Sequence, residues 1–193
     1  MASKVGGRVV GVLMAIAVFV VSFWISRILD AWVEPYLPVK NLQNATLVDL
    51  THGVALLVAW IFGWLSVPII ALAILLAVFP VWGAAAFHGS VVMLAFAKAA
   101  VMPLAFDVFR ACGVDPRGAE PHASNWRLLL LVGFVASVLS NQVQYWAECC
   151  TDMGPRDVLV SQTASIAGDM LGVFVTLLVA MMAFRWIRDW PAE

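Results

Sequence analysis

The feature that most constrains this chain is a run of 48 residues, 50–97, that contains no Lys, Arg, Asp or Glu. Soluble domains rarely contain such a run, since about a quarter of their residues are charged. About 20 apolar residues cross a hydrocarbon core of about 30 Å, so the run suffices for two spans and part of a third. The sequence therefore predicts an integral membrane protein.

The rest of the composition agrees with this class and excludes several others. The 193 residues are 63% hydrophobic and 12% charged, with a net charge of −1, so no basic stripe is present to follow a nucleic-acid backbone. The motifs G-x-S-x-G, H-E-x-x-H and C-x-x-C are absent from the sequence. We therefore expect a single membrane domain over 1–193 with no soluble domain, no enzymatic activity, no metal, no cofactor and no nucleic-acid partner.

Charge-free runs and prolines divide the chain into a predicted all-α bundle of about six transmembrane helices. The stretches "WLSVP" (64–68) and "FPVWG" (79–83) are the expected breaks in the longest run, because proline disfavours helix at the residue before it. The helix at 67–80 is short, so it is expected to be tilted or re-entrant. The predicted helices cover 9–28, 50–64, 67–80, 82–108, 128–145 and 158–184.

The distribution of Lys and Arg predicts the orientation. Six crossings place both termini on one side, and cytoplasmic loops carry the excess of basic residues. Three loop cations fall on the opposite side, namely Arg27, Lys40 and Arg156. Seven fall on the terminal side: Lys4, Arg8, Arg110, Arg117, Arg127, Arg185 and Arg188. We therefore expect a multi-pass protein of the cell inner membrane with both termini in the cytoplasm.

Asp169 is the one charged residue in the 27-residue run 158–184. A charged side chain near the middle of a bilayer costs about 2.5 to 3.5 kcal/mol on insertion scales. Such a carboxyl is therefore expected to be protonated, partnered or exposed to a wet cavity. An ionisable residue inside the membrane is by default a candidate functional site.

Polar residues gather around the predicted depth of Asp169. Ser137, Ser140, Asn141 and Gln144 recur at steps of three and four and line one helix face, and a second polar face lies on the helix at 158–184. There, Ser165, Gly168 and Gly172 are expected to let these two helices pack closely. The predicted result is an outward-facing polar cavity with ligand-binding residues Asp169, Asn141, Gln144, Gln162 and His88.

Structural roles compete with this interpretation. Asn and Gln side chains in membrane helices commonly hydrogen-bond to a neighbouring helix whatever the function. For Asn141 and Gln144, each taken alone, such a packing role is the favoured interpretation. Lys98 is expected in the inner half of its helix, with its ammonium reaching the cytoplasmic interface. His52 is expected near the outer surface. With no third ligand beside it and His88, a metal site is not expected.

Two stretches carry a resemblance to a known family. "VDLTHGVALLVAWIFGWLSVP" (48–68) and "ASIAGDMLGVFVTLL" (164–178), with Gly168, Asp169 and Gly172 as a Gly-Asp-x-x-Gly pattern, resemble the membrane-associated sensor domains of bacterial signalling proteins. The resemblance implies a bacterial inner-membrane input module, and no output domain is expected in this chain. The size and helix number are also similar to those of the substrate-binding subunits of energy-coupling vitamin transporters.

Three functions remain open at this point. The first is binding of a small molecule or signal in the polar cavity, as a sensor-like input module or a transporter substrate-binding subunit. The second is a non-catalytic accessory or assembly subunit whose helix faces dock onto another membrane protein. The third is a proton-coupled carrier in which Asp169 is the titrating group. All three share the lipid bilayer as the immediate surroundings.

Overall fold

The chain is all-helical over the residues that the structure, a computed structural model, describes, namely 2–33, 36, 47–118, 125–147 and 155–189. Lys40, which the orientation argument uses, lies outside these residues. The α-helices are α1 (Ala2–Val33), α2 (Leu50–Phe62), α3 (Ser66–Trp82), α4 (Gly89–Ala111), α5 (Asn125–Ala147) and α6 (Pro155–Asp189). Two short 3₁₀ segments, η3 (Gly63–Leu65) and η4 (Gly83–Phe87), separate α2, α3 and α4. The predicted all-α class is confirmed.

The two breaks in the longest apolar run, at 63–65 and 83–87, lie close to the predicted stretches 64–68 and 79–83, but they arise for a different reason. Gly63 and Gly83 follow α2 and α3 with φ values of 59° and 53°, a region that residues with a side chain rarely enter. Pro80 instead lies inside α3. The helices therefore end at glycines that can adopt positive φ, and the prolines nearby do not set the boundaries.

Among the residues that the structure describes, five stretches are long and apolar enough to cross a membrane: Gly6–Val33, Leu50–Phe87, Gly89–Ala111, Trp126–Ala147 and Val158–Trp186. These support a multi-pass membrane protein. The second stretch contains α2, η3 and α3 together, and α2 has only 13 residues, about 20 Å of helix. Helix α3 has 17 residues and is longer than α2; a tilted or re-entrant course for 67–80 stays a prediction.

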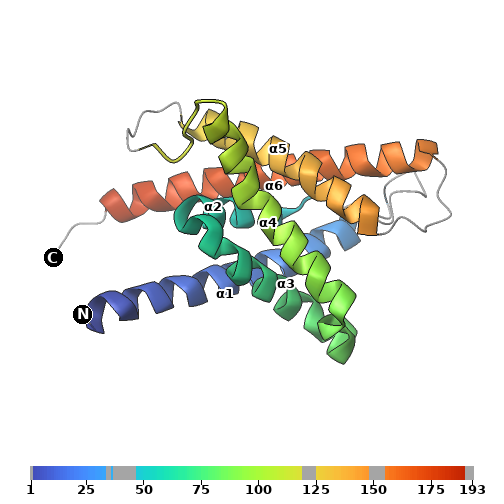
Figure 1. Cartoon of the computed structure of the whole chain (residues 1–193), viewed down its shortest axis with the longest axis horizontal. Helices are drawn as coiled ribbons and strands as arrows, with labels where there is room; N and C mark the ends of the chain where they lie inside the picture. The colour runs from blue at the N-terminus through green and yellow to red at the C-terminus, as the bar shows by residue number, and fades with distance from the viewer. Residues whose placement is uncertain (1, 34–35, 37–46, 119–124, 148–154, 190–193) are drawn as a thin grey trace.

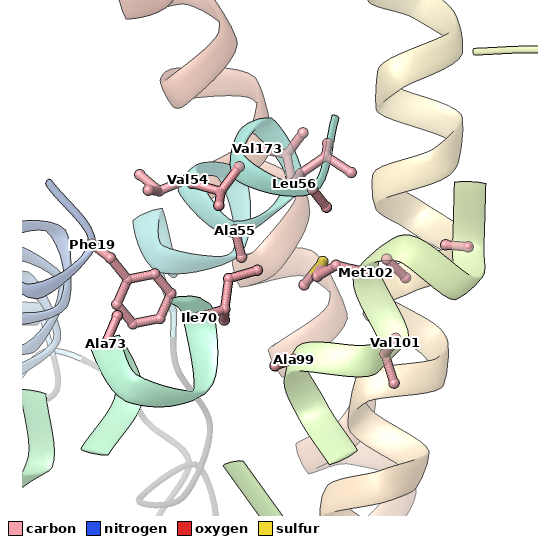
Figure 2. Packing of buried hydrophobic residues seen from close by; sticks show 14 of the residues in the cluster. Phe19, Val54, Ala55, Leu56, Ile70, Ala73, Ala99, Val101, Met102 and Val173 are labelled. Atoms are coloured by element: carbon pink, nitrogen blue, oxygen red, sulfur yellow. The ribbon is translucent and has the colours of Figure 1, made fainter. Parts of the chain in front are cut away.

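The short helix α2 is the centre of the molecule. It packs against α1, α3, α4, α5 and α6, and Figure 1 shows it between the two long helices α1 and α6. Its side chains Leu56 and Ala59 have no exposed surface. In Figure 2, Ala55 of α2 lies beside Ile70 of α3, within a cluster of buried apolar residues from several helices. A helix this short and this enclosed is stabilised mainly by its packing.

The outer helices leave large apolar side chains exposed. Val9, Leu13 and Val18 of α1 are each at least half exposed, as are Leu159 and Met182 of α6. Exposed apolar surface on this scale suits contact with lipid. The first turns of α1 and the last turns of α6 lie at the same end of the molecule (Figure 1).

Candidate functional site

The site is built around the start of α2. Asp49 is its N-cap residue, and the carboxylate Oδ1 accepts hydrogen bonds from the backbone N–H groups of Thr51 (2.8 Å) and His52 (3.3 Å) and from the Thr51 hydroxyl. The first N–H groups of a helix have no partner within it, so a capping carboxylate stabilises this end. The Leu50 N–H donates to the Ser26 hydroxyl of α1 at 3.0 Å. The backbone entering α2 is thereby satisfied inside the protein.

The start of α2 lies against the middle of α6. The Asp49 N–H donates to the Gly168 carbonyl at 3.1 Å, and a side-chain carbon at Gly172 would overlap the backbone carbonyl group of Asp49. One turn along α2, a carbon at Gly53 would lie 2.8 Å from the Gly172 carbonyl oxygen. The absence of side chains at Gly53 and Gly172 therefore permits the backbones of α2 and α6 to touch.

This contact corrects the packing role predicted for the small residues of α6. Gly168 and Gly172 were expected to bring α6 close to α5, whereas they approach the start of α2. Ser165, the third of these residues, lines a cavity. The sequence pattern identifies residues that allow close packing, but it does not identify the helix that packs against them.

Asp169 projects into the same region and is 5% exposed. Its Oδ2 accepts hydrogen bonds from the Ser137 hydroxyl at 2.6 Å and from the Asn141 amide at 2.9 Å, both on α5. The polar faces predicted for α5 and α6 therefore meet at this carboxyl group. The Nδ1 atom of His52 lies 3.8 Å from the same oxygen. A buried carboxyl in an apolar bundle requires partners of this kind.

His52 is held in one ring orientation by α5. Its Nε2 lies 3.2 Å from the Gly133 carbonyl oxygen, which can only accept, so Nε2 carries a hydrogen and Nδ1 faces Asp169. The expectation that His52 lies near the outer surface is wrong, since the side chain is 5% exposed and reaches Asp169. The cause is the position of α2, which begins beside the middle of α6 and not at an end of the bundle.

A cavity of about 320 Å³ lies beside these residues. Its polar wall is formed by α5, α6, the start of α2 and nearby residues of α1 and α4: Ser26, Arg27, Asp49, Thr51, His52, Lys98, Ser140, Asn141, Gln144, Ser165 and Asp169. Its apolar wall comes mainly from α1, α3 and α4: Phe19, Phe23, Ala55, Ile70, Ile74, Val78, Trp82, Val91, Leu94, Ala95 and Met102. Small-molecule sites commonly combine mostly apolar walls with a few polar groups.

The lining residues place the cavity in one half of the bundle. They come from the second half of α1, the second half of α5 and, apart from Met102, the first half of α4. This is the half away from the end at which α1 begins and α6 ends. The predicted gathering of polar groups in one half of the bundle therefore agrees with the structure.

Lys98 departs from its expected position. Its Nζ donates to Gln144 Oε1 at 3.0 Å across the cavity wall, so the side chain does not reach the terminal side. Helix α4 begins at Gly89, not at 82, so Lys98 is its tenth residue and lies in its first half. Gln144 lines the cavity as predicted.

Two predicted cavity residues lie elsewhere. His88 is exposed at the N-cap of α4, with its Nδ1 3.0 Å from the Ser90 hydroxyl. Gln162 lies 3.5 Å from Gln142, which is exposed on α5, and neither residue lines the cavity. The break at η4 explains His88, because the residue precedes α4 and does not lie two turns inside it.

Sequence reasoning overlooked Asp49, Thr51 and Ser26 as members of this region. One signal was present for Asp49, since an Asp directly before an apolar helical run is typical of an N-cap. Ser26 carried no such signal, because its role depends on the crossing of α1 and α2. Among the described residues, no group of three His, Cys, Asp or Glu side chains could hold a metal ion.

Comparison with known proteins adds no assignment to this geometry. No protein-family model matches the chain, and no match is found among curated proteins or solved structures. The functional argument therefore depends on the residues of the chain itself.

Proposed function

We propose that this chain is a bacterial inner-membrane protein that binds a small molecule in the cavity beside Asp169. The observation that carries the proposal is the coincidence of a 320 Å³ cavity with a carboxyl group that is 5% exposed. Intramembrane carboxyl groups are costly, so a chain that places one in a cavity wall and surrounds it with donors is equipped to bind a polar ligand group. Asp169, Asn141 and Gln144 are the proposed binding residues.

The two walls of the cavity suit an amphipathic ligand. One wall carries hydroxyl, amide, imidazole and carboxyl groups, and the other carries aliphatic and aromatic side chains such as Phe23 and Trp82. Burial of the apolar part of a ligand would supply binding free energy, while the polar groups would set its orientation. This division is compatible with either an input module of a sensor or a substrate-binding subunit of a transporter.

The proposed topology has six crossings with both termini in the cytoplasm. In this arrangement, α2 belongs to the second crossing, and its N-terminus lies in the middle of the bundle beside Gly168. Non-helical backbone at that depth is tolerated where protein encloses it, and the bonds from Asp49 and Leu50 satisfy this requirement. The cavity then lies in the outer half, facing the outside.

Intact-complex mass spectrometry of the protein, extracted in mild detergent from its native membrane, tests the proposal. We expect a retained small molecule in the wild type and its loss in Asp169→Asn. Asp107→Asn is the matched control. Asp107 accepts a hydrogen bond from Trp64 Nε1 at 2.8 Å and does not line the cavity. A wild-type protein without any retained small molecule, or equal retention in Asp169→Asn, would contradict the proposal.

A role as an accessory or assembly subunit is the second candidate, and α1 favours it. Only 11% of the α1 span is buried, against 28 to 39% for the other four spans. A helix with so much free surface can contact lipid or pack against another membrane protein. Stoichiometric protein neighbours without a small molecule, in the same mass spectrum, would support this candidate over the first.

A further inference from the structure

The charged groups around the cavity do not balance if His52 is neutral. Asp49 and Asp169 contribute two negative charges, and Lys98 contributes one positive charge. Arg27 on α1 lines the cavity but is exposed, and Asp30, three residues further along α1, accepts from the Leu47 N–H and adds one negative charge nearby, so these two charges cancel in the count. The residues of α3 and α5 that line the cavity carry no charge. One negative charge is therefore left over.

A proton on the His52–Asp169 pair removes this excess. Since Nε2 of His52 donates to Gly133, its Nδ1 either presents a lone pair to Asp169 Oδ2 across 3.8 Å or carries a proton. A lone pair facing a carboxylate is repulsive, whereas an imidazolium with a carboxylate, or an imidazole with a carboxylic acid, is not. The pair is therefore expected to hold one proton when the cavity contains no cation.

We propose that the cavity binds an organic monocation and that its binding releases the proton held by His52 and Asp169. This inference rests on the proposed function. One positive charge enters and one proton leaves to solvent, so the net charge of the cavity stays constant and no covalent bond other than that to the proton changes. Both states avoid an uncompensated buried charge.

The polar atoms that remain available in the cavity suit a cation. Oδ1 of Asp169 and Oδ2 of Asp49 accept no hydrogen bond from any residue that the structure describes. Lys98, a half-buried cation of the wall, already donates to Gln144. Three aromatic side chains, Phe19, Phe23 and Trp82, also line the cavity, and aromatic faces attract organic cations. An anion would instead meet two carboxyl groups.

The test uses three small compounds of similar shape with the wild-type protein in detergent. Benzyltrimethylammonium is the cation, neopentylbenzene is its uncharged isostere, and benzoate is an anion. Titration calorimetry in two buffers of different ionisation enthalpy gives the number of protons released. We expect about one proton released per bound cation, and an affinity that falls up to about tenfold for each unit of decreasing pH below neutrality.

Two substitutions should move the cation affinity in opposite directions. Asp169→Asn removes the excess negative charge, so affinity for benzyltrimethylammonium should fall about tenfold or more and proton release should disappear. Lys98→Gln removes the opposing positive charge, so affinity should rise about threefold or more. Asp107→Asn and Arg110→Gln, outside the cavity lining, are the matched controls and should leave both quantities unchanged.

The outcomes separate this inference from the proposed function. Binding of the cation without proton release, tighter binding of benzoate, or equal binding of neopentylbenzene would overturn the inference and leave a ligand cavity standing. Failure of benzyltrimethylammonium to bind also overturns it. If, in addition, no small molecule is retained in the mass spectrum of the wild type, the proposed function fails as well.

Discussion

The contact between α2 and α6 and the contact between α3 and α4 are both close, but they are built from different groups. Alanine is the commonest buried residue of α3 and of α4, with Ala71 and Ala99 fully buried. Where α2 meets α6, glycine carbons and backbone carbonyls touch, and Asp49, His52 and Asp169 lie beside them. The first contact is apolar, and the second is crowded with polar groups.

The difference comes from where the helices begin. The chain enters α4 through η4, whose residues are largely exposed, so the first N–H groups of α4 lie at the surface. Helix α2 begins inside the bundle, where its free N–H groups must find protein partners. Small residues are enough for close packing in lipid, but a helix end inside the bundle also requires capping groups. Those capping groups are what bring polar chemistry to the cavity.

Among the substitutions that test this difference between the two contacts, Gly172→Ala should cause the largest loss of stability. The added carbon would overlap the Asp49 backbone, which cannot move as a flexible side chain can, so we expect a loss of about 3 kcal/mol or more in the free energy of unfolding. Thermal unfolding in detergent measures it. Gly89→Ala is the matched control, since no atom lies within 4 Å of an added carbon there. Equal stability of the two variants would contradict the close contact of α2 with α6.

A smaller effect is expected when the cap of α2 is removed. Asp49→Ala loses the acceptor for the N–H groups of Thr51 and His52, which should cost about 1 to 2 kcal/mol. Asp49→Ser retains a capping oxygen and should recover most of that loss. Unfolding curves of the two variants measure this difference. Similar losses of unfolding free energy in both would assign the effect to the charge of Asp49 and not to capping.

The smallest effect is expected in the apolar contact. Ala99→Ser adds one hydroxyl at a fully buried position of α4, but that hydroxyl can bond to the carbonyl of the preceding turn of its own helix. We therefore expect a change of no more than about 0.6 kcal/mol in unfolding free energy, which is the average for a hydrogen bond between membrane helices. A loss as large as that of Gly172→Ala would remove the distinction between the two contacts.

The all-helical membrane class could be predicted from the sequence, because charge is excluded from hydrocarbon. The helix bounds were only approximate, because the breaks were placed by prolines whereas glycines end α2 and α3. The depth of α2 could not be predicted. Residues 50–62 are apolar from their first position, so by composition they resemble a helix that enters from the surface. Only the contacts of Asp49 with Gly168 and of Leu50 with Ser26 place that start inside the bundle.

The same limitation affected the site. The stripes containing Asn141 and Asp169 were visible because a helix repeats every 3.6 residues, and these two residues meet at 2.9 Å. His88 and Lys98 were misplaced because their depth was counted from a predicted helix start at 82, whereas α4 begins at Gly89. His52 was misplaced although the start of α2 at Leu50 was predicted, because that start lies inside the bundle. The helix face on which a residue lies depends only on local spacing, whereas the depth predicted for a residue depends on where its helix is placed and begins. Ligand binding by any of these residues stays a prediction.

The C-terminal end of α2 is also held by hydrogen bonds. Arg117 donates to the Ala59 carbonyl at 3.2 Å, and Trp60 Nε1 donates to the Pro116 carbonyl at 3.3 Å, so residues that follow α4 hold the C-terminal turn of α2. Helix α2 thus connects the cavity wall to a surface loop about 20 Å away. Both ends of α2 are therefore held by hydrogen bonds. Sliding of α2 along its axis to enlarge or close the cavity would strain the 116–117 segment at its C-terminal end.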